Sequence, residues 1–324
     1  MYNNKYFQIT REVGRAVTAT YDKRYGDVTL YSNGGTLYRD WLRRLGIGPG
    51  MIRSVYIDGN IVLPKDASGE ANNKAYLFGG MCHLQRIDTT KMDTSKVKDM
   101  NQMFCQCKDL RDIDLSGFKT SGVTDMSSMF VDCQSLRSLD LSSFDTSNVT
   151  DMAGMFAGCH ELRSLNIAKL RTSQVTSMQG MFSGCHSLSS LDVSGFDTSN
   201  VKDMMSMFKD CKTLLLLNLS HFDTSRVESM RGMFCGCSHL TTVDVGRFNT
   251  SNVNSMSLMF AQCTALDHLN IGGFDMSHVK DTGWMFSQCK NLRTLVIDIR
   301  INGSANTERM IDGCPKEMRI VPAV

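Results

Sequence analysis

One phrase, FDTSNVTDMAGMFAGC at 144–159, recurs eight times with small changes along this chain of 324 residues. Its valine returns every 26 residues, and the same step relates the serine, phenylalanine, cysteine and leucine columns. The valines are Val97, Val123, Val149, Val175, Val201, Val227, Val253 and Val279. A fixed period of this length indicates a solenoid, in which each repeat buries its apolar face against its neighbours.

The spacing of apolar residues changes within each repeat, and this change predicts the secondary structure. Leu136, Leu139 and Leu141 form an LxxLxL pattern, whose alternation is typical of a short strand. FDTS supplies turn-forming residues, with Ser147 placed to cap a helix. The next apolar residues have the spacing of one helical face: Val149, Met152, Met155, Phe156 and Cys159. The pattern predicts an α/β solenoid of about eight strand-turn-helix units with a parallel sheet.

The strand and the phrase together, LxxLxL and FDTSNVxDMxxMFxxC, resemble the 26-residue leucine-rich repeat of the BspA-like bacterial surface proteins over about two-thirds of the chain. The segment before the repeats, with VTLYSNGGTLY, a tryptophan and IRSVYIDG, is similar to the region that precedes such repeats. The resemblance implies a leucine-rich repeat solenoid whose parallel sheet lines a concave face. It also implies a surface protein that acts in adhesion and host-protein binding.

The repeat boundaries predict three segments. Residues 1–75 form a small α+β N-terminal cap, with two short strands around a Gly-rich turn at 27–38, a helical turn at RDWLRRLG, and a strand pair joined by a DG turn in MIRSVYIDGNIVL. Residues 76–300 form the solenoid, beginning with a half-repeat that lacks the cysteine. Residues 301–324 form a C-terminal cap or tail that contains a decayed ninth unit.

The cysteine and methionine columns raise the question of chemistry, and geometry favours a structural role. Equivalent Cβ atoms in stacked strands lie about 4.8 Å apart, whereas a disulfide needs about 3.8 Å and zinc needs four converging ligands. We therefore expect buried thiols packed with methionine, and no metal or cofactor. Cys105 and Cys235 lie outside the column, at a position that another repeat fills with Lys209, so a partly exposed reactive thiol is the alternative there.

Outward positions of the strands vary between repeats and are the candidate binding residues. One column holds Asp114, Asp140, Asn166, Asp192, Asn218, Asp244 and Asn270. A hydrogen-bond ladder that orients turns is the first interpretation of this column, and a site for a cation or a basic partner is the alternative. A neighbouring column holds Arg111, Arg137 and Arg163, which we expect to pair with these acids and with Asp112.

An apolar pair breaks this polar pattern. TLLLLNLS places Leu215 and Leu216 where other repeats have Arg, Ser or Thr, near Thr241, Thr242 and His268. Such a pair at the middle of a concave surface resembles the centre of an interface; ordinary isolated exposed leucines are the alternative.

A column of small residues ends differently. It runs through Gly154 and Gly180 and ends in Leu258 and Trp284. Local capping by the C-terminal tail is the expected reason, and a ligand-stacking tryptophan is the alternative.

Composition and motifs restrict the function. Lys and Arg number 35 against 33 Asp and Glu, a net charge of +2 that argues against nucleic-acid binding. The sequence contains no stretch of 18 uncharged apolar residues, which membrane insertion would need. It also contains no catalytic motif that would predict an enzyme.

We expect a non-enzymatic interaction and adhesion module that binds a protein or glycan, including a host extracellular protein, through the concave face. The expected location is the cell surface or outside the cell. The alternative is an intracellular, cytoplasmic repeat scaffold or effector, favoured by a start unlike a signal peptide and by the abundance of thiols.

Overall fold

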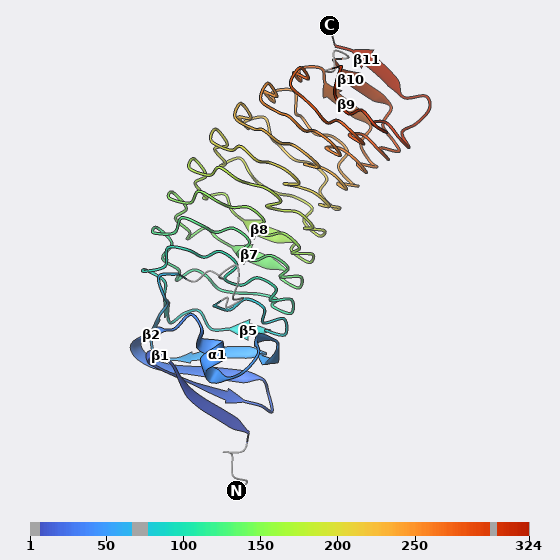
Figure 1. Cartoon of the computed structure of the whole chain (residues 1–324). Helices are drawn as coiled ribbons and strands as arrows, with labels where there is room; N and C mark the ends of the chain where they lie inside the picture. The colour runs from blue at the N-terminus through green and yellow to red at the C-terminus, as the bar shows by residue number, and fades with distance from the viewer. Residues whose placement is uncertain (1–6, 67–76, 299–302, 324) are drawn as a thin grey trace. The chain divides into compact units, whose positions relative to one another are not determined.

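The computed structural model describes residues 7–66, 77–298 and 303–323. Its contacts divide the chain into two compact units: unit 1 comprises Met1–Val149 and Gly158–Lys169, and unit 2 comprises Thr150–Ala157 and Leu170–Val324. Each unit contains coils of a parallel β-solenoid, where a coil is one turn of the chain and corresponds to one repeat (Figure 1). The solenoid predicted from the repeat is therefore confirmed.

Unit 1 begins with a six-stranded sheet in the order β5-β3-β2-β4-β6, with β1 antiparallel to β2. Its strands are β1 (Gln8–Asp22), β2 (Asp27–Leu37), β3 (Ser54–Asp58), β4 (Ile61–Val62), β5 (Arg86–Ile87) and β6 (Met92–Asp93). A short helix, α1 (Trp41–Leu45), and a 3-10 turn, η2 (Pro49–Met51), lie between β2 and β3. All pairs other than β1 with β2 are parallel, so the sheet continues directly into the first coils.

The N-terminal elements differ from the expected hairpins. The NGG sequence lies inside β2, and the hairpin turn is instead closed by Gly26, whose backbone is left-handed (φ 75°) and whose N–H donates to the Asp22 carbonyl at 3.0 Å. β3 and β4 do not pair with each other across the DG turn, because both pair in parallel with β2. The predicted helical turn is present as α1.

The strands of the coils are very short. Unit 1 contains β7 (Ser138–Asp140) paired in parallel with β8 (Ser164–Asn166), and unit 2 contains β9 (His268–Ile271), β10 (Thr294–Ile297) and β11 (Arg319–Pro322) in the order β11-β10-β9. Residues 303–323 form one more coil, since β11 pairs in parallel with β10.

The predicted helix after each strand is wrong: the segment is a series of tight turns. In the coil at 178–185, alternate backbone N–H groups donate to carbonyls of the next coil: Met178 to Asp203 (3.0 Å), Gly180 to Met205 (2.8 Å), Phe182 to Met207 (2.9 Å) and Gly184 to Lys209 (2.7 Å). The N–H groups between them donate three residues back: Met181 to Met178 (3.2 Å), Ser183 to Gly180 (2.9 Å) and Cys185 to Phe182 (3.1 Å). An α-helix would instead direct every N–H four residues back within its own segment.

Two columns of left-handed backbone produce this arrangement. One contains Gly154 (φ 61°) and Gly180 (φ 59°), and the other contains Gly158 (φ 73°) and Gly184 (φ 74°). A positive φ is incompatible with a right-handed helix and is accessible to glycine at little cost. Most coils have glycine, serine, aspartate or glutamine at these two positions, whereas the last three have Leu258, Trp284 and Arg309 at the first of them. This left-handed backbone turns alternate N–H groups toward the next coil.

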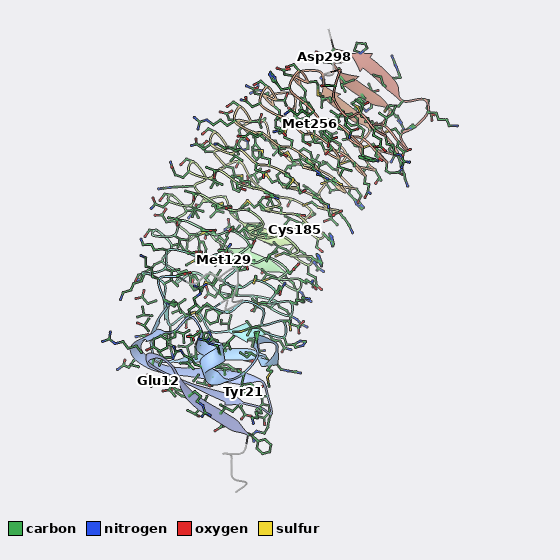
Figure 2. The ribbon with its side chains drawn as sticks, viewed as in Figure 1. Glu12, Tyr21, Met129, Cys185, Met256 and Asp298 are labelled. Atoms are coloured by element: carbon green, nitrogen blue, oxygen red, sulfur yellow. The ribbon has the colours of Figure 1, made fainter. Side chains whose placement is uncertain are left out.

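The predicted core columns are confirmed even though they do not form a helix. Val149, Met152, Met155, Phe156 and Cys159 are all 0% exposed. Figure 2 shows the side chains that fill the coils, with Cys185 and Met256 among those labelled, and both are fully buried. Equivalent phenylalanines stack face to face, as in the pair Phe182 and Phe208 at 5.7 Å between ring centroids and 5° between planes. Burial of each such phenylalanine or methionine side chain contributes about 1.5–3 kcal/mol to the free energy of folding.

The FDTS segment orients a turn through its acid and buries its threonine. Asp145 accepts a hydrogen bond from the Ser147 N–H at 3.1 Å, so Ser147 lies in a turn and caps no helix. Thr120, at 2% exposure, donates its hydroxyl to the Asp145 carbonyl at 3.0 Å and accepts the Asp145 N–H at 2.9 Å. The threonine column therefore ties each coil to the next from inside the core.

The described residues contain no helix long and apolar enough to cross a membrane.

Gly180→Ala distinguishes the turn from a helix. An added Cβ has only one neighbour within 4 Å, Cβ of Ser183 at 3.8 Å, so packing does not obscure the backbone effect. Alanine in place of glycine would stabilise a helix by about 1 kcal/mol, whereas at a left-handed position we expect a loss of about 1 kcal/mol. Urea unfolding followed by circular dichroism measures the sign, with Gln179→Ala as the neighbouring exposed control. A stabilised Gly180→Ala variant would contradict the turn.

Met155→Asp tests the core. The side chain is 0% exposed, so an aspartate there is buried without a partner, and we expect a loss of about 3–5 kcal/mol and a lower Tm. Ser143→Asp, at an exposed position, is the control and should leave Tm nearly unchanged. Equal thermal stability of Met155→Asp and the wild type would contradict the buried position.

Candidate functional site

The outward strand positions of unit 1 are charged and mostly serve the fold. On β7, Asp140 accepts the Ser142 N–H at 2.9 Å and the Asn166 side-chain amide at 2.9 Å. This is the predicted hydrogen-bond ladder, in which the acid orients a turn and the asparagine of the next coil joins it. Asp114 accepts the Ser116 N–H in the same way at 2.9 Å. These hydrogen bonds lower the pKa of Asp114 and of Asp140, with the backbone N–H as the largest cause.

The arginines of unit 1 pair less than expected. Arg137 meets Glu161 at 3.3 Å, with both side chains about half exposed, so the pair contributes little to stability. Arg111 and Arg163 are exposed and make no ion pair with the described residues, including Asp112. The pairing that we expected with the strand acids is therefore not formed.

The strand face of unit 2 is mainly neutral. Leu215 and Leu216 are exposed, at 50% and 65%. Within residues 77–298 they are the only large hydrophobic side chains that are exposed. The Leu215 N–H donates to the Ser189 carbonyl at 3.4 Å, which keeps this segment in register with the previous coil.

Three of the predicted residues in unit 2 come together. Thr242, Asp244 and His268 line a shallow depression of about 360 Å³ on the strand face, together with Val296 of β10. His268 contacts the carboxylate of Asp267 at 3.1 Å. The same depression is also lined by Val243, Gly246, Leu269, Asn270 and Thr294.

The remaining predicted residues of unit 2 lie outside this depression. Thr241 is exposed, and Asp192 is an exposed acid that accepts the Ser194 N–H at 2.9 Å. Asp244 accepts the Gly246 N–H at 3.1 Å, so it also has a structural bond although it lines the depression.

The cysteines show no sign of a reactive centre in the described residues. Each column cysteine donates its thiol to a phenylalanine carbonyl of the previous coil, as Cys211 does to Phe182 at 3.2 Å. Burial raises the pKa of Cys105 to about 12 and also raises the pKa of Cys235. A reactive cysteine needs a lowered pKa, so the alternative of a reactive thiol at these two positions is disfavoured. No cluster of metal-binding side chains is found among the described residues.

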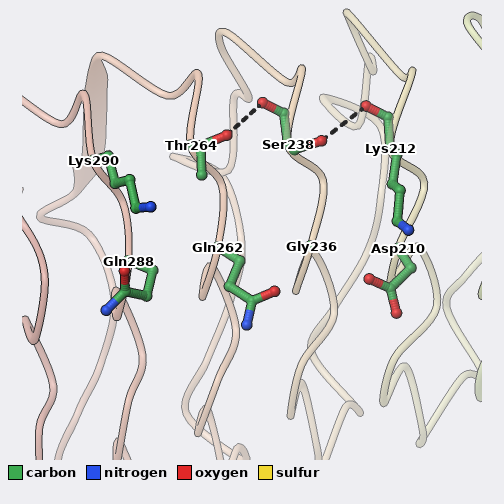
Figure 3. Close-up of a pocket in the computed structure, with 8 residues that line it drawn as sticks. All are labelled: Asp210, Lys212, Gly236, Ser238, Gln262, Thr264, Gln288 and Lys290. Atoms are coloured by element: carbon green, nitrogen blue, oxygen red, sulfur yellow. Dashed lines mark hydrogen bonds between the residues drawn. The ribbon is translucent and has the colours of Figure 1, made fainter.

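A second depression in unit 2 was missed by sequence reasoning. Figure 3 shows its lining, which comes from four successive coils between the turn segment and the strand. We call it the side groove; its residues are Asp210, Lys212, Gly236, Ser238, Gln262, Thr264, Gln288 and Lys290. The groove depends on the left-handed column at Asp210, Gly236, Gln262 and Gln288, which the predicted helix would not contain.

Comparison with known proteins identifies a matching family model and two similar solved structures. A family model described as "Mycoplasma protein of unknown function, DUF285" matches residues 72–165, 137–216 and 213–320. Leucine-rich repeat proteins from Eubacterium ventriosum and Bacteroides ovatus are 16% identical over 95% of this chain and over 95% and 94% of their own chains, with TM-scores of 0.37 and 0.39. The parallel pairing of successive coils within this chain defines its fold. No protein with a curated description matches the sequence.

The Asp140 carboxylate tests the structural role of the acid ladder. Its folded-state pKa is lowered, so its stabilisation is present above about pH 4 and is lost as the pH falls through the folded value. Carboxyl titration by NMR should give a midpoint below 3.8 for Asp140. Ser142→Ala should raise this midpoint only part of the way, because it removes the hydroxyl but keeps the backbone donor. An unperturbed Asp140 in the wild type would contradict the ladder.

Proposed function

We propose a function for this chain on the premise of its family. The chain belongs to the family described as Mycoplasma protein of unknown function, DUF285, because the family model matches well over half of its residues. The chain is a non-enzymatic interaction module. It binds a protein partner through the strand face of unit 2, with Leu215 and Leu216 as the apolar centre.

The exposed leucine pair is the observation that carries this proposal. The repeat buries its apolar residues almost completely, yet these two are 50% and 65% exposed at positions that other coils fill with Arg, Ser, Thr, Asp or His. Desolvation of two adjacent leucines favours association, and residues around an apolar centre exclude water in typical interfaces. Thr241, Thr242 and His268 provide such a polar rim.

The shape and chemistry of the rim favour a protein over a small molecule. The depression beside the leucines is shallow and combines Val296 with the polar Thr242, Asp244 and His268. A protein side chain with an apolar body and a basic or hydrogen-bonding end would contact the leucines and these polar groups together. Arg and Tyr have this character and are enriched in interfaces.

The remaining features support binding over catalysis. The strand acids are held by turn N–H groups, and the column cysteines are buried with carbonyl partners. Catalysis requires a nucleophile, a base and a charge stabiliser that converge in one pocket. The described residues of the strand face present no such group.

Adhesion at the cell surface is the biological setting that we propose, because the repeat resembles that of BspA-like surface proteins. A host extracellular protein is then the class of partner. The competing setting is an intracellular scaffold, and an in-frame signal sequence upstream of Met1 in the genomic DNA would favour the surface.

The double variant Leu215→Asp with Leu216→Asp tests the interface. Biolayer interferometry against a panel of immobilised extracellular-matrix proteins should detect binding by the wild type and at least about 30-fold weaker binding by the variant, as for loss of a hot spot. Thr176→Asp with Lys202→Asp, two exposed positions of the same unit, is the matched control and should bind like the wild type. Unchanged binding by the leucine variant would assign the partner to another surface.

A further inference from the structure

The side groove of unit 2 has the features of a second binding site. It has a volume of about 320 Å³ and spans four coils, with Gly236 among its lining residues (Figure 3). A Cβ on Gly236 would lie 2.2 Å from Oδ1 of Asp210, so the absence of a side chain keeps this part of the groove open. The size lies within the range of ligand sites in proteins.

Charged and amide side chains gather in the side groove without a partner in the described part of the chain. The Lys212 and Lys290 ammonium groups, the Asp210 carboxylate and the amides of Gln262 and Gln288 have no hydrogen-bond or ion-pair partner among the described residues. The acids of the turn columns, by contrast, are bonded to backbone N–H groups. Polar groups that the fold does not use are available to a ligand.

Hydroxyl groups of the side groove present acceptors. Thr264 donates its hydroxyl to the Ser238 carbonyl at 3.0 Å, and Ser238 donates its hydroxyl to the Lys212 carbonyl at 3.3 Å. Each proton is therefore committed to the chain, while the oxygen lone pairs can accept hydrogen bonds from a ligand.

The backbone of the side groove cannot pair with an added peptide strand. The N–H groups of Asp210, Gly236, Gln262 and Gln288 all donate to carbonyls of the next coil, at 2.6–2.8 Å. β-strand addition needs unpaired backbone groups at an edge, and this groove offers no such donors. All its lining residues are polar or glycine, so it also lacks an apolar pocket for a peptide anchor.

Its chemistry fits a carbohydrate that carries a carboxylate. Amides, an acid and acceptor hydroxyls match sugar hydroxyl groups, which both donate and accept hydrogen bonds. Two lysines against one aspartate leave a charge of +1, which favours an anion but is small for a nucleic acid. We propose that the side groove binds a short acidic oligosaccharide, with Lys212 and Lys290 at its carboxylates and Gln262 and Gln288 at its hydroxyl groups.

The repeat of the coils sets the length of this ligand. Four successive coils place Lys212 and Lys290 roughly 14 Å apart along the stack, from a spacing of about 4.8 Å per coil. One sugar ring does not span this distance, so an oligosaccharide with more than one ring is required. The site lies outside the strand face and does not depend on the leucine pair.

Isothermal titration calorimetry of the full chain with trigalacturonate and with a hyaluronan tetrasaccharide, each of which carries at least two carboxylates, tests the proposal. At least one of these acidic sugars should bind, and Lys212→Ala with Lys290→Ala should weaken its binding at least about tenfold. Lys202→Ala with Lys280→Ala removes two exposed lysines of the same unit outside the groove and should bind like the wild type. The Leu215→Asp with Leu216→Asp variant should also bind the acidic sugar normally, which separates this site from the strand-face interface.

Four results would overturn the proposal. They are no heat of binding with either acidic sugar at millimolar concentration, unchanged binding by the Lys212 and Lys290 variant, equal binding of the neutral maltotriose, and equal binding of a tetraglutamate peptide. The last result would assign the groove to acidic peptides. Gln262→Ala gives an independent readout in a folded protein, because it removes only an exposed amide and should weaken the acidic sugar and maltotriose alike.

Discussion

Within each unit, hydrogen bonds from alternate turn N–H groups to the next coil hold the coils together, and the other features of the fold depend on them. The series from Met178 to Gly184 illustrates the rule. Four N–H groups donate to carbonyls of the next coil, and those between them donate to carbonyls of their own coil and close turns. These bonds require left-handed backbone at two fixed positions of each coil. With this backbone, the Met, Phe and Cys side chains point inward in register. The buried threonine hydroxyls donate to carbonyls of the next coil, as Thr120 does to Asp145.

The same constraint explains why the sequence predicted the core but not the secondary structure. Val149, Met152, Met155, Phe156 and Cys159 have spacings that fit a helical face, and a run of turns with two left-handed residues places the same five inward. Periodicity reports which residues face the core and cannot distinguish these backbones. The distinguishing signal was present in the glycine columns, such as Gly154 with Gly158, since two glycines four residues apart, as in three of the eight repeats, weaken a helix.

Candidate surfaces were predictable only where they interrupt the repeat. Leu215 and Leu216 were visible because the repetition supplies eight internal comparisons, and the structure places both at the surface. The side groove was not visible in the sequence. Its residues do not interrupt the repeat in the way that the leucine pair does, and its hollow depends on the turn geometry. The acids were visible, but their role was ambiguous, and Asp140 shows the reason. Its bond to the Ser142 N–H recurs along its column, as at Asp114 and Asp244, and only the structure shows that bond.

Polar groups on these coils therefore divide into two sets by whether the fold uses them. An aspartate that accepts a backbone N–H is required for its turn, and its exposed position carries no evidence of a ligand. An amide or ammonium group without a hydrogen-bond partner in the described residues has no such role. Exposure of such a group alone is no evidence of a ligand, but its position in a hollow is. In a solenoid, where nearly every residue recurs, this hydrogen-bond criterion separates function from repetition more sharply than composition does. By it, the Asp140 column belongs to the fold, while Gln262, Gln288 and the two lysines of the side groove remain available for binding.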